Sequence, residues 1–391
     1  MEALLKSFKD IYGDKEEIRV FQSPGRVNLI GEHIDYNGGL VFPCALDFGT
    51  IAIVRKREDS IVNLASTNFD LKVEVDLNDL VYKELDDWAN YPKGVMKVMR
   101  DHGYTLGGMD ILISGNIPNG AGLSSSASLE VLIGEIINVI FNKSSIDMVE
   151  IVKMSQEAEN KFVGVNCGIM DQFAVGMGKS KKAILLNCAT LEYKYADVEL
   201  GDYKIVLMNT NKRRALNESK YNERRAECDK VLEIINSKRD NKIENLCDLS
   251  MQELEIYKSS IQDEILIKRV THVIGENERV KDAFEALNEG KLNKFGELLT
   301  ESHNSLRDLY EVTGIELDTL AEEAIKIHGC LGARMTGAGF GGCAIALVKL
   351  ENEEEFIAKL TEVYTKKIGY APSFYSSGIG NGACELNLVN A

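Results

Sequence analysis

The chain has 391 residues, 45% of them hydrophobic and 27% charged, which indicates a globular protein long enough for two domains. Its formal charge of −16 argues against a nucleic-acid partner, because phosphate backbones are bound by basic surfaces. The sequence opens with no basic-then-apolar leader and contains no apolar run of membrane-spanning length, so we expect a cytoplasmic protein without a membrane partner.

Apolar runs typical of strands come first in the chain, at 17–23, 40–56, 60–66, 71–77 and 109–117. Helical periodicity follows at 124–142 and 146–162, and then strand patterns at 183–188 and 203–210. The second half is predicted to be mostly helical, at 219–237, 262–287, 291–309 and 316–327, before a glycine-rich turn, a strand and a last helix at 337–342, 343–348 and 353–367. This pattern predicts an α+β protein of two lobes, 1–200 and 201–391.

The cysteines and histidines argue against a disulfide framework and against a zinc site. Eight cysteines occur singly with no CxxC pair, and five histidines form no HExxH motif. We therefore expect reduced thiols that pack as small hydrophobic groups.

The most informative segment is 23–39, SPGRVNLIGEHIDYNGG, which follows a strand-like run. It places Arg26, Glu32, His33 and Asp35 among five glycines and prolines. Buried apolar segments do not carry so much charge, and glycines allow the backbone to approach a ligand closely. The segment therefore indicates a site for a small polar molecule, although an isolated histidine such as His33 is more often structural.

Residues 118–128, PNGAGLSSSAS, lie between a predicted strand and an apolar helix. Gly120 and Gly122 would let backbone N–H groups face inward, with Ser124, Ser125 and Ser126 at the helix start, where the helix dipole favours an anion. A serine-capped helix is the alternative interpretation, but a single serine is enough for a cap. The loop is not a Walker A motif, because GxxxxGK[ST] is absent.

Three later segments have both ordinary and functional interpretations. Asp171 lies in GVNCGIMDQFAVGMG (164–178) and is as typical of a helix cap or a turn as of a catalyst. Trp88 and Tyr91, in DDWANYPKG, would pack in a core or stack on a base. Tyr221 belongs to a basic stretch, 211–228, whose charges we expect mostly on a solvated helix face; they are Lys212, Arg213, Arg214, Lys220, Arg224 and Arg225.

Together these segments resemble the motifs of galactokinases, members of the GHMP family of small-molecule kinases. The resemblance rests on the signature at 23–39, the WANY string, the phosphate loop at 118–128, CGIMDQF at 167–173 and a glycine-rich run at 335–348, in family order. In the last run Ala338 stands where many relatives have glycine, beside Gly337, Gly339, Gly341 and Gly342.

The resemblance implies the two-lobed GHMP-kinase fold, with a mixed-sheet N-terminal lobe, helices over an antiparallel sheet in the C-terminal lobe, and the active site in the cleft between them. It implies transfer of phosphate from ATP to α-D-galactose, giving galactose 1-phosphate at the entry to the Leloir pathway of carbohydrate metabolism. We expect a monomer that uses ATP and Mg²⁺ as cofactors.

The resemblance also implies roles for individual residues. Asp171 would be the catalytic carboxylate, as a general base or as an electrostatic anchor, with Arg26 as its partner. The sugar would be bound by Asp35 at its ring hydroxyls, by Glu32 and His33 at its exocyclic hydroxymethyl group, and by Gly168 and Tyr221. ATP would contact Ser66, Trp88, Tyr91, Gly120, Ala121, Gly122, Leu123, Ser124, Ser125 and Ser126. Ser126 and Glu159 would bind Mg²⁺.

Two alternatives remain at this point. An N-acetylgalactosamine kinase would share the chemistry but need room for a 2-acetamido group. A galactose sensor that binds sugar and ATP and contacts a transcriptional repressor would catalyse nothing. The sensor interpretation is disfavoured because the phosphate loop and its serines are intact, with Arg26, Glu159 and Asp171 present.

Overall fold

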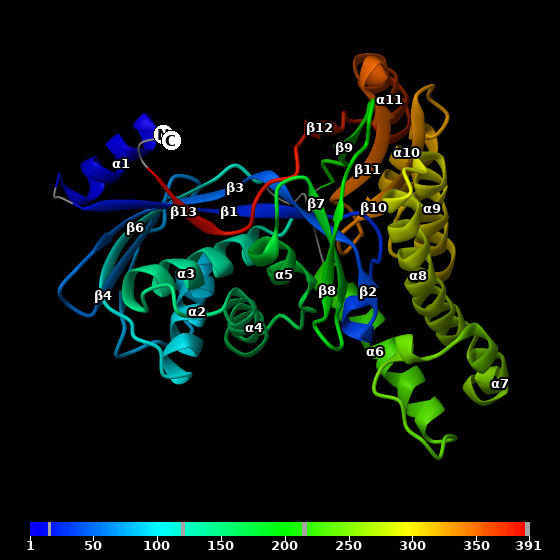
Figure 1. The fold of residues 1–391 in the computed structure, drawn as a ribbon, viewed down its shortest axis with the longest axis horizontal. Coiled ribbons are helices and arrows are strands. Elements are labelled where there is room, and N and C mark those ends of the chain that lie inside the picture. The colour runs from blue at the N-terminus through cyan, green and yellow to red at the C-terminus, as the bar shows by residue number, and fades with distance from the viewer. Residues whose placement is uncertain (15–16, 119–121, 213–216, 388–391) are drawn as a thin grey trace.

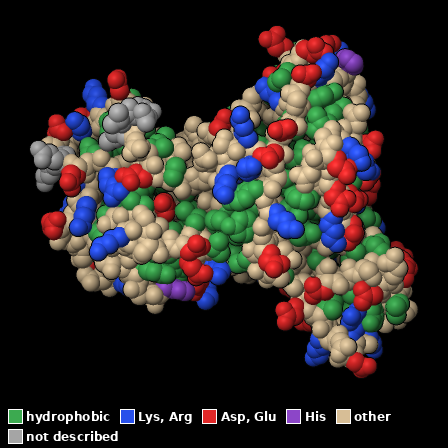
Figure 2. Space-filling view, in the orientation of Figure 1, with side chains coloured by type: hydrophobic (Ala, Val, Ile, Leu, Met, Phe, Trp, Pro, Cys, Tyr) green, Lys and Arg blue, Asp and Glu red, His purple; other side chains and the backbone are tan. Residues whose placement is uncertain are grey.

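The computed structural model describes residues 1–14, 17–118, 122–212 and 217–387. The molecule has two lobes joined at a narrower waist (Figures 1 and 2). On the face seen in Figure 2, acidic and basic side chains are interspersed over both lobes. Within the described residues, no helix is long and apolar enough to cross a membrane.

The N-terminal lobe is built on a mixed six-stranded sheet with the order β13-β1-β3-β6-β4-β5. All neighbouring strands in it are antiparallel except β4 and β6, which run parallel. The strands are β1 (Ile18–Asn28), β3 (Pro43–Lys56), β4 (Ile61–Ser66), β5 (Val73–Asp76), β6 (Met109–Gly115) and β13 (Cys384–Leu386). The chain thus returns from the C-terminal lobe to pair with its own first strand.

Helices cover both faces of this sheet (Figure 1). Alternate residues of a strand point to opposite faces, so Val20, Ile53 and Leu112 pack with Phe8 of α1 on one side. Phe21, Val54 and their neighbours pack with α2, α3 and α4 on the other. The helices are α1 (Glu2–Tyr12), α2 (Asn90–Asp101), α3 (Ser125–Phe141) and α4 (Met148–Ala158).

A small antiparallel sheet with the order β2-β7-β8 lies between the lobes, next to the short helix α5 (Figure 1). These elements are β2 (Leu40–Val41), β7 (Lys182–Asn187), β8 (Tyr193–Asp197) and α5 (Met170–Met177).

The C-terminal lobe places helices over an antiparallel four-stranded sheet with the order β10-β11-β9-β12. Its strands are β9 (Tyr203–Asn209), β10 (Cys330–Thr336), β11 (Cys343–Lys349) and β12 (Ser373–Ser376). Its helices are α6 (Asn217–Asn236), α7 (Met251–Ile261), α8 (Glu264–Asn288), α9 (Leu292–Ser305), α10 (Ile315–Ala324) and α11 (Glu353–Ile368). Its apolar core continues into the signature segment through Val27, Leu29, Ile30 and Ile34.

The predicted fold class is confirmed: a mixed-sheet lobe, a helical lobe on an antiparallel sheet, and a pocket between them. The longer predicted strands and helices occur within a few residues of their expected bounds. The division at residue 200 stays a prediction, and β13 lies in the N-terminal sheet although it comes from the far end of the chain. All eight cysteines are free.

Candidate active site

A pocket of about 290 Å³ lies between the two lobes. It brings together most of the candidate residues: Arg26, Glu32, His33, Asp35, Gly122, Leu123, Ser124, Ser125, Ser126, Glu159, Gly168, Asp171 and Tyr221. The glycine-rich run of the C-terminal lobe contributes Gly337 and Ala338 to the wall. Gly120 and Ala121 lie outside the described residues.

Arg26 and Asp171 form a two-pronged ion pair at the centre of this pocket. The Nε and Nη2 atoms of Arg26 donate to the two carboxylate oxygens of Asp171, each at 2.9 Å. Arg26 is buried near the end of β1, whereas the Asp171 side chain, in the first turn of α5, is 30% exposed. Burial opposes the charge of Arg26, but Asp171 and Glu32 raise its pKa above the usual value. The pair therefore presents a charge-balanced carboxylate to the pocket.

The phosphate loop meets this pair at the start of α3. Ser124 occupies the N-cap position with a left-handed backbone (φ 60°), but its side chain makes no cap hydrogen bond. Its hydroxyl instead donates to Asp171 Oδ2 at 2.5 Å. The capping interpretation of Ser124 is therefore wrong. Because the helix start lacks a side-chain cap, its first N–H groups and its dipole remain available to an anion.

Glu159 is buried beside the loop, at the end of α4, and is part of a cluster of polar groups. Gln172 Nε2 donates to Glu159 at 2.6 Å and to Glu130 at 3.0 Å, and Cys167 Sγ donates to Glu159 at 3.2 Å. Burial, together with the charge of Glu159, raises the pKa of Glu130 well above its usual value. Two carboxylates thus share one amide donor.

This cluster fits a small hard cation. Glu159 supplies an anionic oxygen, and the Ser126 hydroxyl lies within hydrogen-bond reach of it. One buried oxygen of Glu130, Oε1, has no hydrogen-bond partner. No group of three or more His, Cys, Asp or Glu side chains suited to a metal occurs in the described ranges, so any cation would take its remaining ligands from elsewhere.

The residues expected to bind the sugar form one side of the pocket, the sugar side, and they are crowded together: Glu32, His33, Asp35, Gly168 and Tyr221. A Cβ on Gly168 would come within 1.9 Å of Asp35 Oδ2, so only glycine allows this close approach. Burial and repulsion from Asp171 raise the pKa of Asp35 to about 7. Burial and the charge of Asp35 raise the pKa of Tyr221 well above its usual value, so its phenol keeps a proton to donate.

His33 is buried at a positive φ of 63° and already has two partners. Burial and nearby positive groups lower its pKa to about 3, so the ring is neutral. Its Nε2 donates to the Ala338 carbonyl at 3.1 Å, which leaves Nδ1 to accept from the Tyr36 hydroxyl at 2.8 Å. A direct sugar contact by either ring nitrogen would require one of these bonds to be exchanged.

Three candidate nucleotide residues lie outside the pocket lining. Ser66 ends β4 and accepts a hydrogen bond from the Asn68 N–H. Trp88 is only 7% exposed and stacks on Phe69, with 6.2 Å between ring centroids. Tyr91 lies in the first turn of α2. The structure therefore does not gather these residues with the rest of the site.

Sequence reasoning missed Glu130, Gln172 and Arg334, a buried arginine that forms an ion pair with Glu32. Glu130 lies four residues after Ser126 on α3, a spacing that places both on one helix face and could have indicated it. Gln172 stands next to Asp171 in the matched string. Arg334 carried no comparable signal, since a lone arginine in a short strand is ordinarily a surface residue.

Known families match most of the chain. The galactokinase galactose-binding signature matches residues 6–56, and the N-terminal and C-terminal domains of GHMP kinases match 90–179 and 283–366.

Individual relatives match nearly end to end. The galactokinase of Clostridium tetani is 61% identical over 383 residues, covering 98% of this chain and 97% of the relative. That of Fusobacterium nucleatum is 53% identical, covering 99% and 100%. The crystal structure of Lactococcus lactis galactokinase complexed with galactose superposes with a TM-score of 0.95 at 50% identity, covering 98% and 99%. A mevalonate kinase structure shares the fold alone, with a TM-score of 0.66 at 20% identity, covering 94% and 100%.

Proposed function

The chain belongs to the galactokinase family of GHMP kinases, and on this premise we propose how its pocket phosphorylates galactose. The reaction transfers the γ-phosphoryl group of ATP to the anomeric hydroxyl of α-D-galactose. The products are ADP and α-D-galactose 1-phosphate, which would enter the Leloir pathway.

The observation that carries the proposal is the Arg26–Asp171 pair, which lies between the sugar side and the phosphate loop. Both oxygens of Asp171 accept from Arg26, and Oδ2 also accepts from Ser124. A carboxylate has about four acceptor positions. One position therefore remains for the anomeric hydroxyl of a sugar bound against Asp35, Gly168 and Tyr221.

In the proposed step, Asp171 holds the anomeric hydroxyl in line with the γ-phosphorus. The hydroxyl oxygen forms the new P–O bond while the bond to the β-phosphate oxygen breaks, and Asp171 takes the hydroxyl proton as ADP leaves. Phosphoryl transfer passes through a loose transition state, which needs alignment and charge neutralisation more than a strong base. Arg26 supplies positive charge that balances Asp171 and faces the transferring group.

The α3 N-terminus, with Ser124, Ser125 and Ser126, would bind the β- and γ-phosphates of ATP. Glu159 and Ser126 would hold Mg²⁺, which when bound neutralises charge on those phosphates. Gln172 would keep Glu159 turned toward the loop through its 2.6 Å hydrogen bond. Trp88 and Tyr91 would flank the adenine at the outer end of the site.

On the sugar side, Asp35 would bind the ring hydroxyls, and Glu32 the exocyclic hydroxyl. Glu32 is 2% exposed, yet it lines the pocket. A hydrogen-bonding group so deeply buried discriminates strongly, because a substrate that lacks its partner hydroxyl leaves it unpaired. His33 would act by holding the Ala338 carbonyl of the opposite lobe in place.

The proposal is tested by ADP release with ATP and Mg²⁺ across galactose, N-acetylgalactosamine, glucose and mevalonate. Turnover on galactose alone is expected. Turnover on N-acetylgalactosamine would assign the chain to a kinase of that sugar. Absence of turnover on every substrate, with Trp88 fluorescence still responding to ATP and galactose, would make the protein a sensor.

A further inference from the structure

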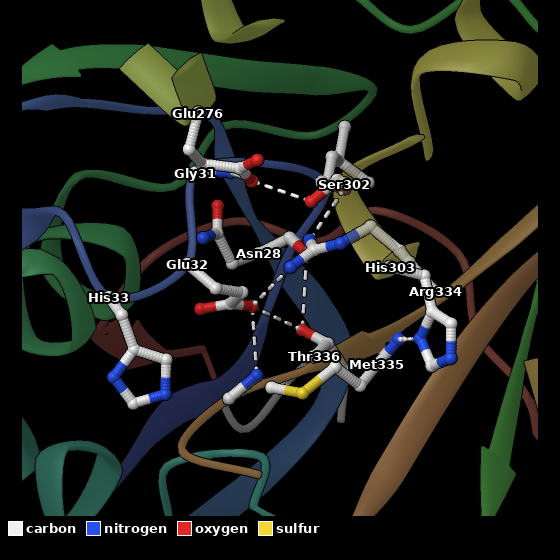
Figure 3. A network of polar contacts seen from close by, with 12 residues as sticks. Asn28, Gly31, Glu32, His33, Glu276, Ser302, His303, Arg334, Met335 and Thr336 are labelled. Carbon is white, nitrogen blue, oxygen red and sulfur yellow. Dashed lines mark hydrogen bonds and ion pairs between the residues drawn. The ribbon is translucent and has the colours of Figure 1, made fainter. Parts of the chain in front are cut away.

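The signature segment is held from the C-terminal lobe by a buried polar network (Figure 3). Glu276 of α8 accepts from the Gly31 N–H at 3.0 Å, and His272 Nε2 lies 3.2 Å from the Glu32 carbonyl oxygen. Arg334 of β10 donates from Nη1 to the carbonyl oxygens of Asn28 and Leu29, at 3.0 and 2.9 Å. The backbone on both sides of Glu32 is therefore fixed by side chains from the other lobe.

The same lobe also holds the Glu32 carboxylate, and it does so through one oxygen only. Oε1 accepts from the Gly337 N–H at 2.8 Å, and it forms an ion pair, without a hydrogen bond, with Arg334 Nη2 at 3.3 Å. The Thr336 hydroxyl lies 3.1 Å from Oε1 and 3.1 Å from the Asn28 carbonyl oxygen, so its one proton is shared between these two acceptors. None of the described residues donates a hydrogen bond to Oε2. In Figure 3 that second oxygen points away from Arg334 and Thr336, on the side of His33.

Burial helps to fix the orientation of the Glu32 carboxylate. Arg334 is completely buried and Glu32 is 2% exposed, so each charge depends on the other for compensation. The Arg334 side chain cannot move freely, because Nη1 is already bonded to two backbone carbonyl oxygens. A fixed guanidinium in turn fixes the rotamer of the carboxylate that it pairs with.

We propose that Arg334 and Thr336 are positioning residues for sugar selectivity, because they occupy Glu32 Oε1 and leave Oε2 alone to accept from the exocyclic hydroxyl of galactose. The inference rests on the proposed sugar contact of Glu32. The orientation of that carboxylate is established before the sugar arrives, so binding costs less side-chain entropy than it would with a mobile glutamate. Arg334 and Thr336 act on the substrate only through Glu32.

The test compares galactose with 6-deoxygalactose, which lacks the exocyclic hydroxyl but keeps the ring hydroxyls. Thr336→Val removes, with little change of shape, the hydroxyl that donates to Oε1 and to the Asn28 carbonyl oxygen, and Thr336→Ser keeps that hydroxyl as a matched control. Arg334→Lys keeps the charge but not the planar fork. KM and kcat are measured for both sugars at saturating ATP, together with the Tm of each variant.

Arg334→Lys is expected to raise the KM for galactose by about tenfold, the size of a lost charge-assisted contact, with kcat nearly unchanged. Thr336→Val is expected to raise it severalfold, and Thr336→Ser to leave it at the wild-type value. The KM for 6-deoxygalactose should not change in any variant, so the preference for galactose falls. A merely structural role would raise the KM values for both sugars together.

Equal losses on both sugars, or an unchanged preference in folded Thr336→Val and Arg334→Lys, would overturn the inference. If Arg334→Lys does not fold, Thr336→Val against Thr336→Ser decides the question. If the wild-type enzyme phosphorylates galactose and 6-deoxygalactose equally well, both the proposed sugar contact of Glu32 and this inference are wrong. The galactokinase reaction itself would stand in that case.

Discussion

On the sugar side of the pocket, Glu32 and His33 are each held by contacts from the C-terminal lobe, through Gly337 and Ala338. Of the residues expected to contact the nucleotide, Ser66, Trp88 and Tyr91 lie outside the pocket lining, whereas those at the start of α3 belong to it. On the proposed assignment, one side would discriminate by rigid, buried hydrogen bonds, whereas the other would offer helix N–H groups and aromatic surface. We expect substitutions on the sugar side to change the kinetic constants for the sugar and not those for ATP. Substitutions on the nucleotide side should have smaller effects.

The largest effect is expected where the two sides meet, at Asp171. Asp171→Asn keeps the shape but removes the proton acceptor, so kcat should fall by about 10³-fold, with the KM for galactose changing far less. ADP release measures both constants, and Asp79→Asn, an exposed carboxylate of the same lobe, is the control. An Asp171→Asn enzyme that keeps a tenth of the wild-type kcat would leave the carboxylate without an important role in the chemistry.

The crowding of the sugar side is tested by Gly168→Ala. The added Cβ would lie 1.9 Å from Asp35 Oδ2, so that carboxylate must move, and the KM for galactose should rise by about tenfold or more. The KM for ATP should stay unchanged. Gly115→Ala is the matched control, because its Cβ would meet nothing closer than 3.7 Å. Equal effects of the two substitutions would show that the sugar side is not tightly packed.

We expect the ionisation of Asp35 to make the KM for galactose depend on pH. Its pKa is raised to about 7, so the carboxyl is mostly protonated at pH 6 and mostly ionised at pH 8. The ionised form is the stronger acceptor, and the KM for galactose should therefore fall by up to about tenfold across this range. Because Asp171 contributes to the raised pKa, Asp171→Asn should shift the midpoint to lower pH.

Steady-state KM measurements from pH 5.5 to 8.5 test this, with Asp35→Asn as the control that should lose the dependence. A wild-type KM that does not vary with pH, or a dependence that persists in Asp35→Asn, would contradict the assignment of Asp35 to sugar binding.

The smallest effect is expected on the nucleotide side. Trp88→Leu removes an aromatic surface worth about 1 kcal/mol, so the KM for ATP should rise severalfold while the KM for galactose does not change. Trp88 is the only tryptophan, and its fluorescence should respond to ATP in the wild type. If the fluorescence does not change when ATP is added, and Trp88→Leu changes neither KM, then Trp88 serves only to pack against Phe69.

Much of the fold could be predicted because its apolar patterns are long. The runs at 40–56 and 109–117 became β3 and β6, and 262–287 became α8. Some of the missed elements contain residues that weaken a pattern: α2 holds Pro92 and Gly94. β10 includes a glycine and the buried Arg334, whose charge is compensated by Glu32 from the other lobe, a contact that local sequence does not reveal.

The candidate site also shows this difference between what local sequence reveals and what it does not. Residues within contiguous motifs, such as Arg26, Glu32 and Asp171, were found and lie together in the pocket. The pairing of Arg26 with Asp171 was expected as well, but the further contacts that orient these groups were not, because Ser124 could be expected to cap its helix as readily as to donate to Asp171. Sequence motifs identify the groups that line the pocket, whereas other partners that orient those groups, such as Arg334 and Glu276, come from distant strands and helices.

The position of the new phosphate on the sugar tests the central claim most directly, since Asp171 is proposed to align the anomeric hydroxyl and no other. The purified protein is incubated with ATP, Mg²⁺ and galactose, and the product is identified by proton and phosphorus NMR. The account predicts a single product, α-D-galactose 1-phosphate, formed together with ADP. Phosphate on any other hydroxyl, or ADP released without a phosphorylated sugar, would contradict it.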